Sequence, residues 1–451
     1  MGQKFSEIKK MCAEAAAAAG VKEYELYYTA SDSAEIEMQG ESVKHLDSSQ
    51  RSGLCLRVLE NGRCGYASTQ LFEQEHLEEL FIRAKENAAY GLEEPEGHFY
   101  TPKAGLSTAE RAQEWSSSLP EMIRNGQQLQ KEMKSSDRRI TDGIRSSLGE
   151  ESGSRAIFNT NGLDVQEYYH YGITLAMSVM EEEGKMDDDF AYCLGNFADI
   201  DMKKLAAEAV EKCGAKMSSG EVVSGKYPVI IEGETFGALL QAYFEIFSGE
   251  AAQKGMTLLA GKEGQQIASE IVTITDDPLS GHSVMPCSFD SEGVPARKKH
   301  VVEHGRLQTL LHNRGTAWKA GTANTGNAGR AGYASNISVQ PYTFYLEPGG
   351  KTGEELFAEA GQGIYVTGVT GLHAGANSVT GDFSIQSEGF LIENGRKARA
   401  VKNFTIAGNF FDLLKNITDL GDTLKLGMPR GRTRFGSPDV RVQELSVAGK
   451  D

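Results

Sequence analysis

The sequence predicts an α+β protein with a duplicated N-terminal α/β domain, residues 1–222, and a C-terminal domain, residues 223–451. We expect the C-terminal domain to be antiparallel, β-rich and barrel-like, with one buried helix. The 451 residues exceed what one hydrophobic core ordinarily holds. The first half uses one β-then-α pattern twice, whereas the second half is rich in Gly, Thr, Val and Asn-Gly turns.

The first β-then-α unit follows an amphipathic N-terminal helix. Residues 25–69 contain short runs of alternating apolar and polar residues, with Asn61-Gly62 as the signal for a hairpin turn. Residues 71–91 then predict a helix, because apolar residues recur there at helical spacing before Gly91. These apolar positions are Leu77, Leu80, Phe81 and Ala84.

The second unit repeats this order. Residues 154–184 again alternate, with Asn161-Gly162 as their turn, and residues 198–217 predict a helix that begins after a capping Asp. A charged helical stretch is expected between the two units, over residues 108–133. Two such units predict an internally duplicated α/β domain.

The second half begins with a Ser/Gly linker, residues 218–228, that leads into a short apolar strand. One helix is expected over residues 237–250, with an apolar face. From about Ile267 onward, short β runs and turns such as Asn394-Gly395 predict an antiparallel sheet or barrel.

The composition argues against several classes of protein. The formal net charge is −17, and no basic stripe is longer than residues 296–300, so direct nucleic-acid binding is not expected. No apolar run reaches the roughly 18 residues that span a bilayer, so no membrane association is expected. The cysteines lack a C-x-x-C pair, which predicts free thiols and a cytoplasmic location. These cysteines are Cys12, Cys55, Cys64, Cys193, Cys213 and Cys287.

The stretch HVVEH, residues 300–304, fits the inverted zinc-peptidase signature H-x-x-E-H. On a helix, His300 and His304 would share a face and could bind one zinc ion. On a strand they would lie about 13 Å apart, too far to share an ion. The upstream Pro295, the two valines and Gly305 favour a strand and a hairpin turn, although the leucines that follow also fit helical spacing.

Two glycine-rich stretches resemble nucleotide-binding motifs without matching them. Residues 220–227 nearly fit a phosphate-binding loop, but Tyr227 replaces the required Ser or Thr and a strand follows, which favours a linker. In residues 361–383 the glycines separate short β runs and no helix is expected to follow, so this is not a dinucleotide fingerprint. We expect His373, in the second stretch, to be structural.

Two further segments carry candidate binding residues. Four acidic residues lie close in sequence and fit either turns, which we favour, or a divalent-cation site. They are Asp276, Asp277, Asp290 and Glu292. Residues 320–330 fit equally a plain surface loop and a loop that contacts a peptide. The peptide-binding candidates in this loop are Thr325, Asn327 and Arg330.

Several stretches of the second half together resemble the TldD/PmbA family, also named modulators of DNA gyrase. They are GKEGQQIASEIVTITDDP, FDSEGVPARKKHVVEHGRLQTLL, NTGNAGR, TGDFSIQSEGFLIENGRKARAVKNFTIAGN and SPDVRVQELSVAG. The first half is similar more loosely, through GLCLRVLENGRCGYAST. This resemblance implies a two-subunit zinc-dependent peptidase, in which a dimeric shell encloses a channel where unfolded peptides bind as an added strand. The TldD-type subunit carries H-E-x-x-x-H on a helix and a distal cysteine, whereas the PmbA/TldE-type subunit lacks the metal site.

The chain departs from the family's metal motif. Counted back without gaps from GKEGQQIASE, the H-E-x-x-x-H positions hold Leu240, Gln241 and Glu245. Both histidines are absent, and the amide of Gln241 cannot act as a general base. No histidine occurs between His170 and His282, and no cysteine follows Cys287.

The resemblance therefore implies a PmbA/TldE-type subunit that is not itself catalytic. It would bind unfolded peptides for proteolysis by a TldD-type partner, which would hold the zinc, and would form a homodimer in isolation. No catalytic residue, metal or cofactor is expected in this chain. Two alternatives remain: a stand-alone homodimeric peptide-binding scaffold, and a peptidase with an unconventional site built from the acidic residues above or from His282, His300 and His312.

Overall fold

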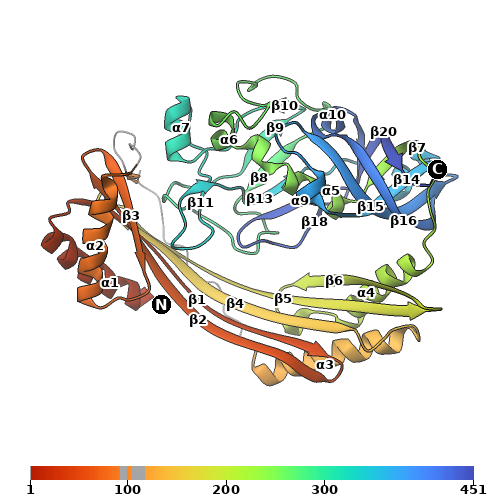
Figure 1. The fold of residues 1–451 in the computed structure, drawn as a ribbon, viewed down its shortest axis with the longest axis horizontal. Helices are drawn as coiled ribbons and strands as arrows, with labels where there is room; N and C mark the ends of the chain where they lie inside the picture. The colour runs from red at the N-terminus through yellow and green to blue at the C-terminus, as the bar shows by residue number, and fades with distance from the viewer. Residues whose placement is uncertain (1, 92–98, 103–116, 451) are drawn as a thin grey trace.

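The computed structural model describes residues 2–91, 99–102 and 117–450 and confirms the predicted α+β class. A long, curved antiparallel sheet forms the N-terminal half and runs beneath the β-rich C-terminal half (Figure 1). None of the helices in these described ranges is long and apolar enough to cross a membrane. All six cysteines are free thiols, as predicted.

The N-terminal sheet has six strands in the order β3-β2-β1-β4-β5-β6, and every neighbouring pair is antiparallel. The strands are β1 Glu23–Gln39, β2 Ser42–Glu60, β3 Arg63–Thr69, β4 Arg145–Asn159, β5 Asp164–Glu182 and β6 Lys185–Leu194. The central pair, β1 and β4, joins two copies of the same β-β-β-helix order. The sequence predicted short β runs here, whereas the structure has continuous strands of up to 19 residues.

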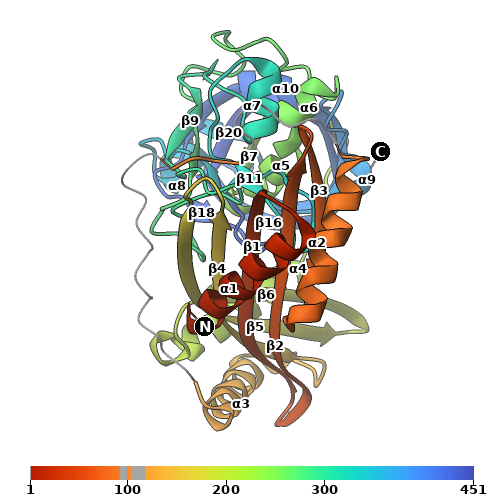
Figure 2. The same ribbon diagram turned by 90° about the vertical axis from the view of Figure 1, so that its left-hand side faces the viewer.

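Four helices cover one face of this sheet. They are α1 Gly2–Ala19, α2 Gln74–Ala88, α3 Leu119–Ser136 and α4 Met202–Met217, and a 3₁₀ turn, Phe197–Asp199, precedes α4. Figure 2 shows α1 and α2 together at one end of the sheet and α3 at the other. The α2 and α4 helices were predicted, and Asp201 caps α4 by accepting a hydrogen bond from the backbone N–H of Lys204 at 2.9 Å.

The helix predicted over residues 108–133 differs from the structure at both ends. Part of that range, 108–116, lies outside the described residues. The helix α3 begins at Leu119, because Ser118 and Glu121 form a capping box that satisfies the backbone donors of its first turn. It continues to Ser136, three residues beyond the predicted end.

The two faces of the sheet follow from the alternation of side chains along each strand. On β1, Leu26 and Tyr28 pack against α1 and α2, and Ile36 and Met38 pack in the cluster formed with α3 and α4. Tyr27 lies between Leu26 and Tyr28 on the strand, so its side chain points to the opposite face and packs with Phe289 of the C-terminal half. The helix-free face of the sheet is thus the face that meets the C-terminal half.

The C-terminal half contains a closed barrel, formed by β16-β15-β14-β7-β20 with β20 pairing back to β16, and β17 extends it. Its strands are β7 Gly225–Ile231, β14 Gly363–Thr370, β15 Asp382–Glu393, β16 Arg396–Asn409, β17 Ile417–Leu420 and β20 Val440–Ala448. The barrel was predicted to be antiparallel, but β7 and β14 pair in parallel. This pair joins segments more than 130 residues apart, which local patterns do not report.

A second six-stranded sheet, β10-β9-β8-β13-β19-β18, lies beside the barrel, and β13 and β19 in it are also parallel. The strands are β8 Ile274–Asp277, β9 Lys299–Glu303, β10 Arg306–Leu307, β13 Thr343–Leu346, β18 Lys425–Leu426 and β19 Arg434–Ser437. Two short strands, β11 Ala328–Gly329 and β12 Ser338–Val339, form a separate antiparallel pair.

The HVVEH stretch forms the predicted hairpin. His300 lies on β9, and His304 and Gly305 form the turn with φ values of 49° and 75°, so that Glu303 pairs with Arg306. Asn61-Gly62 and Asn394-Gly395 make the same kind of two-residue turn with positive φ at both positions. One detail of the Gly-rich stretch was missed, since a one-turn helix, α9 Leu372–Gly375, interrupts its β runs.

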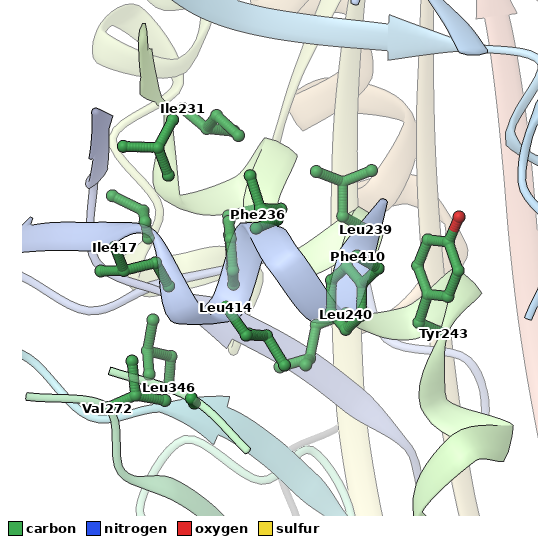
Figure 3. Packing of buried hydrophobic residues seen from close by; sticks show 14 of the residues in the cluster. Ile231, Phe236, Leu239, Leu240, Tyr243, Val272, Leu346, Phe410, Leu414 and Ile417 are labelled. Atoms are coloured by element: carbon green, nitrogen blue, oxygen red, sulfur yellow. The ribbon is translucent and has the colours of Figure 1, made fainter. Parts of the chain in front are cut away.

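The predicted helix over residues 237–250 is three short helical segments. The segments are α5 Gly233–Ala242, a 3₁₀ turn Phe244–Phe247 and α6 Gly249–Gln253. The α5 helix ends at Ala242, and the next residue, Tyr243, stacks its ring on Phe410 at 4.3 Å. Both side chains lie in the central apolar cluster of the C-terminal half (Figure 3). The remaining helices are α7 Arg314–Ala320, α8 Gly353–Ala360 and α10 Phe410–Lys415.

Candidate functional site

A cavity of about 1070 Å³ lies between the helix-free face of the N-terminal sheet and the C-terminal half. The sheet contributes Tyr27, Thr29 and Ser31, alternate residues of β1, together with Arg51 of β2 and Tyr169 of β5. The cavity is at the upper end of the volumes that bind a drug-sized ligand, so it has room for an extended peptide segment.

The opposite wall of the cavity comes from three parts of the C-terminal half. The first is the end of α5 and the 3₁₀ turn that follows, through Gln241, Phe244 and Glu245. The second is the β11–β12 pair with the loop after β11. The third is the turn that contains Arg430 and Arg432. Backbone, aromatic and charged groups therefore surround one space.

The three residues at the family's metal-motif positions do not all face the cavity. Leu240 is fully buried in the apolar core beside Leu239 and Phe236 (Figure 3), whereas Gln241 and Glu245 line the cavity. Burial raises the pKa of Glu245, and nearby Glu250 adds to the rise.

These residues do not fit a zinc ion. Protein zinc sites take three or four ligands from His, Cys, Asp and Glu, and of the three residues at the motif positions only Glu245 is one of these types. Over the described part of the chain, no group of three such side chains is arranged to hold a metal. The wall therefore provides a polar, partly acidic surface to the cavity.

The three peptide-binding candidates from the sequence lie at different depths. Thr325 is buried, and its Oγ1 accepts a hydrogen bond from the backbone N–H of His312 at 2.7 Å. Asn327 is buried as well and donates to Asp276 Oδ2 at 2.7 Å. Arg330 lines the cavity, with its guanidinium 4.8 Å from the centre of the Tyr27 ring.

The acidic residues considered as a cation site are used by the fold. Asp276 accepts hydrogen bonds from the backbone N–H of Tyr342 and from Lys299 Nζ, at 2.7 and 3.0 Å. Asp290 Oδ1 accepts from the backbone N–H groups of Glu292 and Val294, at 2.8 and 2.9 Å. Burial and nearby Glu292 raise the pKa of Asp290 to about 7. These bonds are those of a turn, the interpretation that the sequence favoured.

The remaining members of the two alternative sites also have local roles. Asp277 Oδ1 accepts a hydrogen bond from the backbone N–H of Leu279 at 3.0 Å. His300 is paired with Thr275 Oγ1 at 2.9 Å, and His312 lies 3.2 Å from Thr316 Oγ1. The structure does not bring His282, His300 and His312 together as a metal-binding group in the described residues.

The charged residues that join the two halves were missed in the sequence. Arg155 and Glu167, on neighbouring strands of the sheet, form a buried ion pair at 2.6 Å, and Arg432 of the C-terminal half reaches the same carboxylate at 2.7 Å. Burial alone would raise the pKa of Glu167, but the two arginines outweigh it and hold the pKa below its usual value. Arg155 also donates to the backbone carbonyl of Phe289.

A second buried charge cluster lies on the same face. Arg57 of β2 pairs with Glu25 of β1 at 3.0 Å and lies 3.7 Å from Glu292. Glu292 in turn accepts a hydrogen bond from the backbone N–H of Arg314 at 2.8 Å. The FDSEG turn, a candidate cation site in the sequence, thus connects the C-terminal half to the sheet beside the cavity.

Comparison with known proteins assigns the chain to a family. The family model of the PmbA/TldA metallopeptidase C-terminal domain matches residues 224–449, and this match alone covers half of the chain. The models of domain 1 and of the central domain match residues 24–88 and 113–216. A metalloprotease from Methanothermobacter thermautotrophicus is 27% identical over 438 residues, which cover 91% of this chain and 92% of that protein.

Solved structures agree with this assignment. A modulator of a DNA gyrase from Thermotoga maritima has a TM-score of 0.86 and 29% identity, covering 98% of this chain and all of that one. TldE from Thermococcus kodakarensis has the same fold, with a TM-score of 0.86 and 23% identity over 97% of this chain and all of that one. The chain belongs to the PmbA/TldD family of metallopeptidase-related proteins.

Proposed function

We propose that this protein is a PmbA/TldE-type subunit that binds unfolded peptide segments for proteolysis by a TldD-type zinc subunit and is not itself catalytic. One observation carries the proposal. The helix end at the family's metal-motif positions faces a large cavity, but it presents Gln241 and Glu245 there while Leu240 is buried in the core. A cavity large enough for a peptide segment and the loss of both motif histidines support the proposal.

The cavity wall offers a means of holding a peptide of varied sequence. In the two-stranded pair, β12 has an outer edge beside the cavity, and its residues Ser338 and Val339 line that space. Backbone hydrogen bonds to a strand edge recognise an extended peptide with little demand on its side chains. We propose that a substrate segment adds to β12 and passes Gln241, which belongs to the same wall of the cavity.

The test is reconstitution with defined subunits. Purified protein should contain less than stoichiometric zinc by mass spectrometry and should leave a fluorogenic unfolded peptide uncut. Adding an H-E-x-x-x-H subunit from the same genome should produce cleavage that a chelator abolishes, at a rate above that of the added subunit alone. One zinc per chain together with chelator-sensitive cleavage by this protein alone would refute the proposal.

Two further parts of the proposal concern location and assembly. We place the protein in the cytoplasm, where its six free thiols would stay reduced, and expect a homodimer when no partner is present. Affinity capture from the native host separates this proposal from a stand-alone scaffold. Recovery of an H-E-x-x-x-H subunit supports the proposal, whereas repeated recovery of this chain alone supports the scaffold.

A further inference from the structure

The lining of the cavity is positively charged although the whole chain is acidic. Its lining includes six Lys and Arg side chains and two carboxylates, whereas the chain has 46 Lys and Arg against 63 Asp and Glu. The cations are Arg51, Arg155, Lys254, Arg330, Arg430 and Arg432. A cavity with one sign of charge attracts ligands of the other sign, because its low-dielectric walls concentrate the field.

Four of these cations already have a role within the fold. Arg155 and Arg432 share the carboxylate of Glu167, and Lys254 pairs with Glu250 at 2.7 Å. Arg330 donates to the backbone carbonyl of Ser335 at 2.6 Å and lies close enough to the buried Glu25 to oppose the rise in the pKa of that carboxyl.

Arg51 and Arg430 are the remaining two cations, and both are exposed. No carboxylate within the described residues forms an ion pair with either of them. They come from distant parts of the chain, since Arg51 lies on β2 opposite Ser31, and Arg430 lies in the turn before β19. The fold thus brings two uncompensated positive charges to the same cavity.

We propose that the cavity selects peptide segments rich in Asp and Glu, with Arg51 and Arg430 as the residues that determine this specificity. This inference rests on the proposed function, since it names the substrate class of the same site. A peptide suits the cavity better than a nucleic acid does. A nucleic-acid site uses a basic stripe that follows a phosphate backbone, whereas here the cations line a cavity beside a strand edge.

The test uses end-labelled peptides of identical length that differ only at alternate positions, which carry Asp, Asn or Lys. Fluorescence anisotropy at low salt should show the Asp peptide binding about tenfold more tightly than the Asn peptide, because two exposed charge pairs contribute about threefold each. The Lys peptide should bind most weakly. The preference for Asp should shrink at high salt, since screening weakens exposed charge pairs.

Arg51→Gln/Arg430→Gln should remove most of the preference for the Asp peptide over the Asn peptide. Arg83→Gln/Lys226→Gln is the matched control. It removes the same net charge from residues that are exposed and do not line the cavity, and it should keep the preference. Equal thermal midpoints for both variants and the parent protein confirm that folding is intact.

The outcomes separate this inference from the proposed function. If the Asp, Asn and Lys peptides bind equally, the acidic specificity is overturned and the peptide-binding function stands. If no peptide binds, both are overturned. If a single-stranded oligonucleotide of the same length binds more tightly than the Asp peptide and loses affinity in R51Q/R430Q, the cavity is an anion site for nucleic acid and the peptide specificity is overturned.

Discussion

The two faces of the N-terminal sheet are made by the same strands and are buried in different ways. One face packs Leu26 and Tyr28 against α1 and α2, and among the described residues its buried side chains are apolar or uncharged. The other face carries Glu25, Arg57 and Arg155, which are as inaccessible to solvent as the leucines. The first face is buried by helices close in sequence, and the second is buried by a turn more than 100 residues further along the chain.

This difference has an energetic consequence. Apolar burial is non-directional and tolerates small shifts, whereas buried charges stabilise the protein only when their partners are in place. The charged face therefore fixes where the C-terminal half sits on the sheet, and with it the shape of the cavity between them. Variants on the two faces should distinguish these roles.

The largest effect is expected from Glu167→Gln. This change leaves Arg155, with 3% of its side chain exposed, without its carboxylate partner. Leaving a charge buried and unpaired should destabilise the protein by about 3–5 kcal/mol, measured as a shift of the urea midpoint. The double variant Arg155→Met/Glu167→Leu is the control, because it removes both buried charges and should recover much of the loss. Equal losses in the two variants would contradict this account.

The turn that docks on the charged face should make stability depend on pH. The pKa of Asp290 is about 7 in the folded protein and about 3.9 in an unfolded chain. Because the folded state binds this proton more tightly, its contribution is complete below about pH 4 and is lost as the pH rises towards 7. The stability of the parent protein relative to Asp290→Asn should fall as the pH rises over that range. A difference that stays constant from pH 4 to 7 would contradict the raised pKa.

On the apolar face, Leu26→Ala should cost about 3 kcal/mol of unfolding free energy, since it leaves a cavity beneath α1 and α2. Thr29→Ala is a matched control on the same strand, because Thr29 points to the opposite face and lines the cavity. It should change the urea midpoint little. If both variants lose the same stability, the assignment of alternate residues to opposite faces is wrong.

The sequence was a good guide to features that depend on neighbouring residues. It predicted the hairpins at Asn61-Gly62 and His304-Gly305. A two-residue hairpin turn needs positive φ at both positions, and a glycine at the second position signals such a turn whatever packs around it. It also predicted α2 from the spacing of its buried residues. The break after Ala242 was missed, since the stacking of Tyr243 on Phe410 depends on a residue far along the chain.

The candidate site was less predictable than the fold, for the same reason. Arg330 was identified because it follows a glycine-rich loop in the sequence, and it lines the cavity. Thr325 and Asn327 share that loop, but their side chains turn into the buried hydrogen bonds around Asp276 and His312. Arg51 and Arg430 meet only after folding, and neither lies in a motif.

The smallest loss of stability is expected at an exposed ion pair whose N–O distance equals that of the buried Arg155–Glu167 pair. Lys9 and Asp164 form an ion pair at the edge of the apolar face, and their 2.6 Å separation equals that of Arg155 and Glu167. The exposed fraction of the Asp164 side chain is 55%, so water already solvates this carboxylate and screens its charge. Asp164→Asn should therefore reduce the unfolding free energy by about 0.5 kcal/mol, and less at high salt. A loss as large as that from Glu167→Gln would mean that distance alone sets the strength of these pairs, and that the contrast between the two faces does not depend on burial.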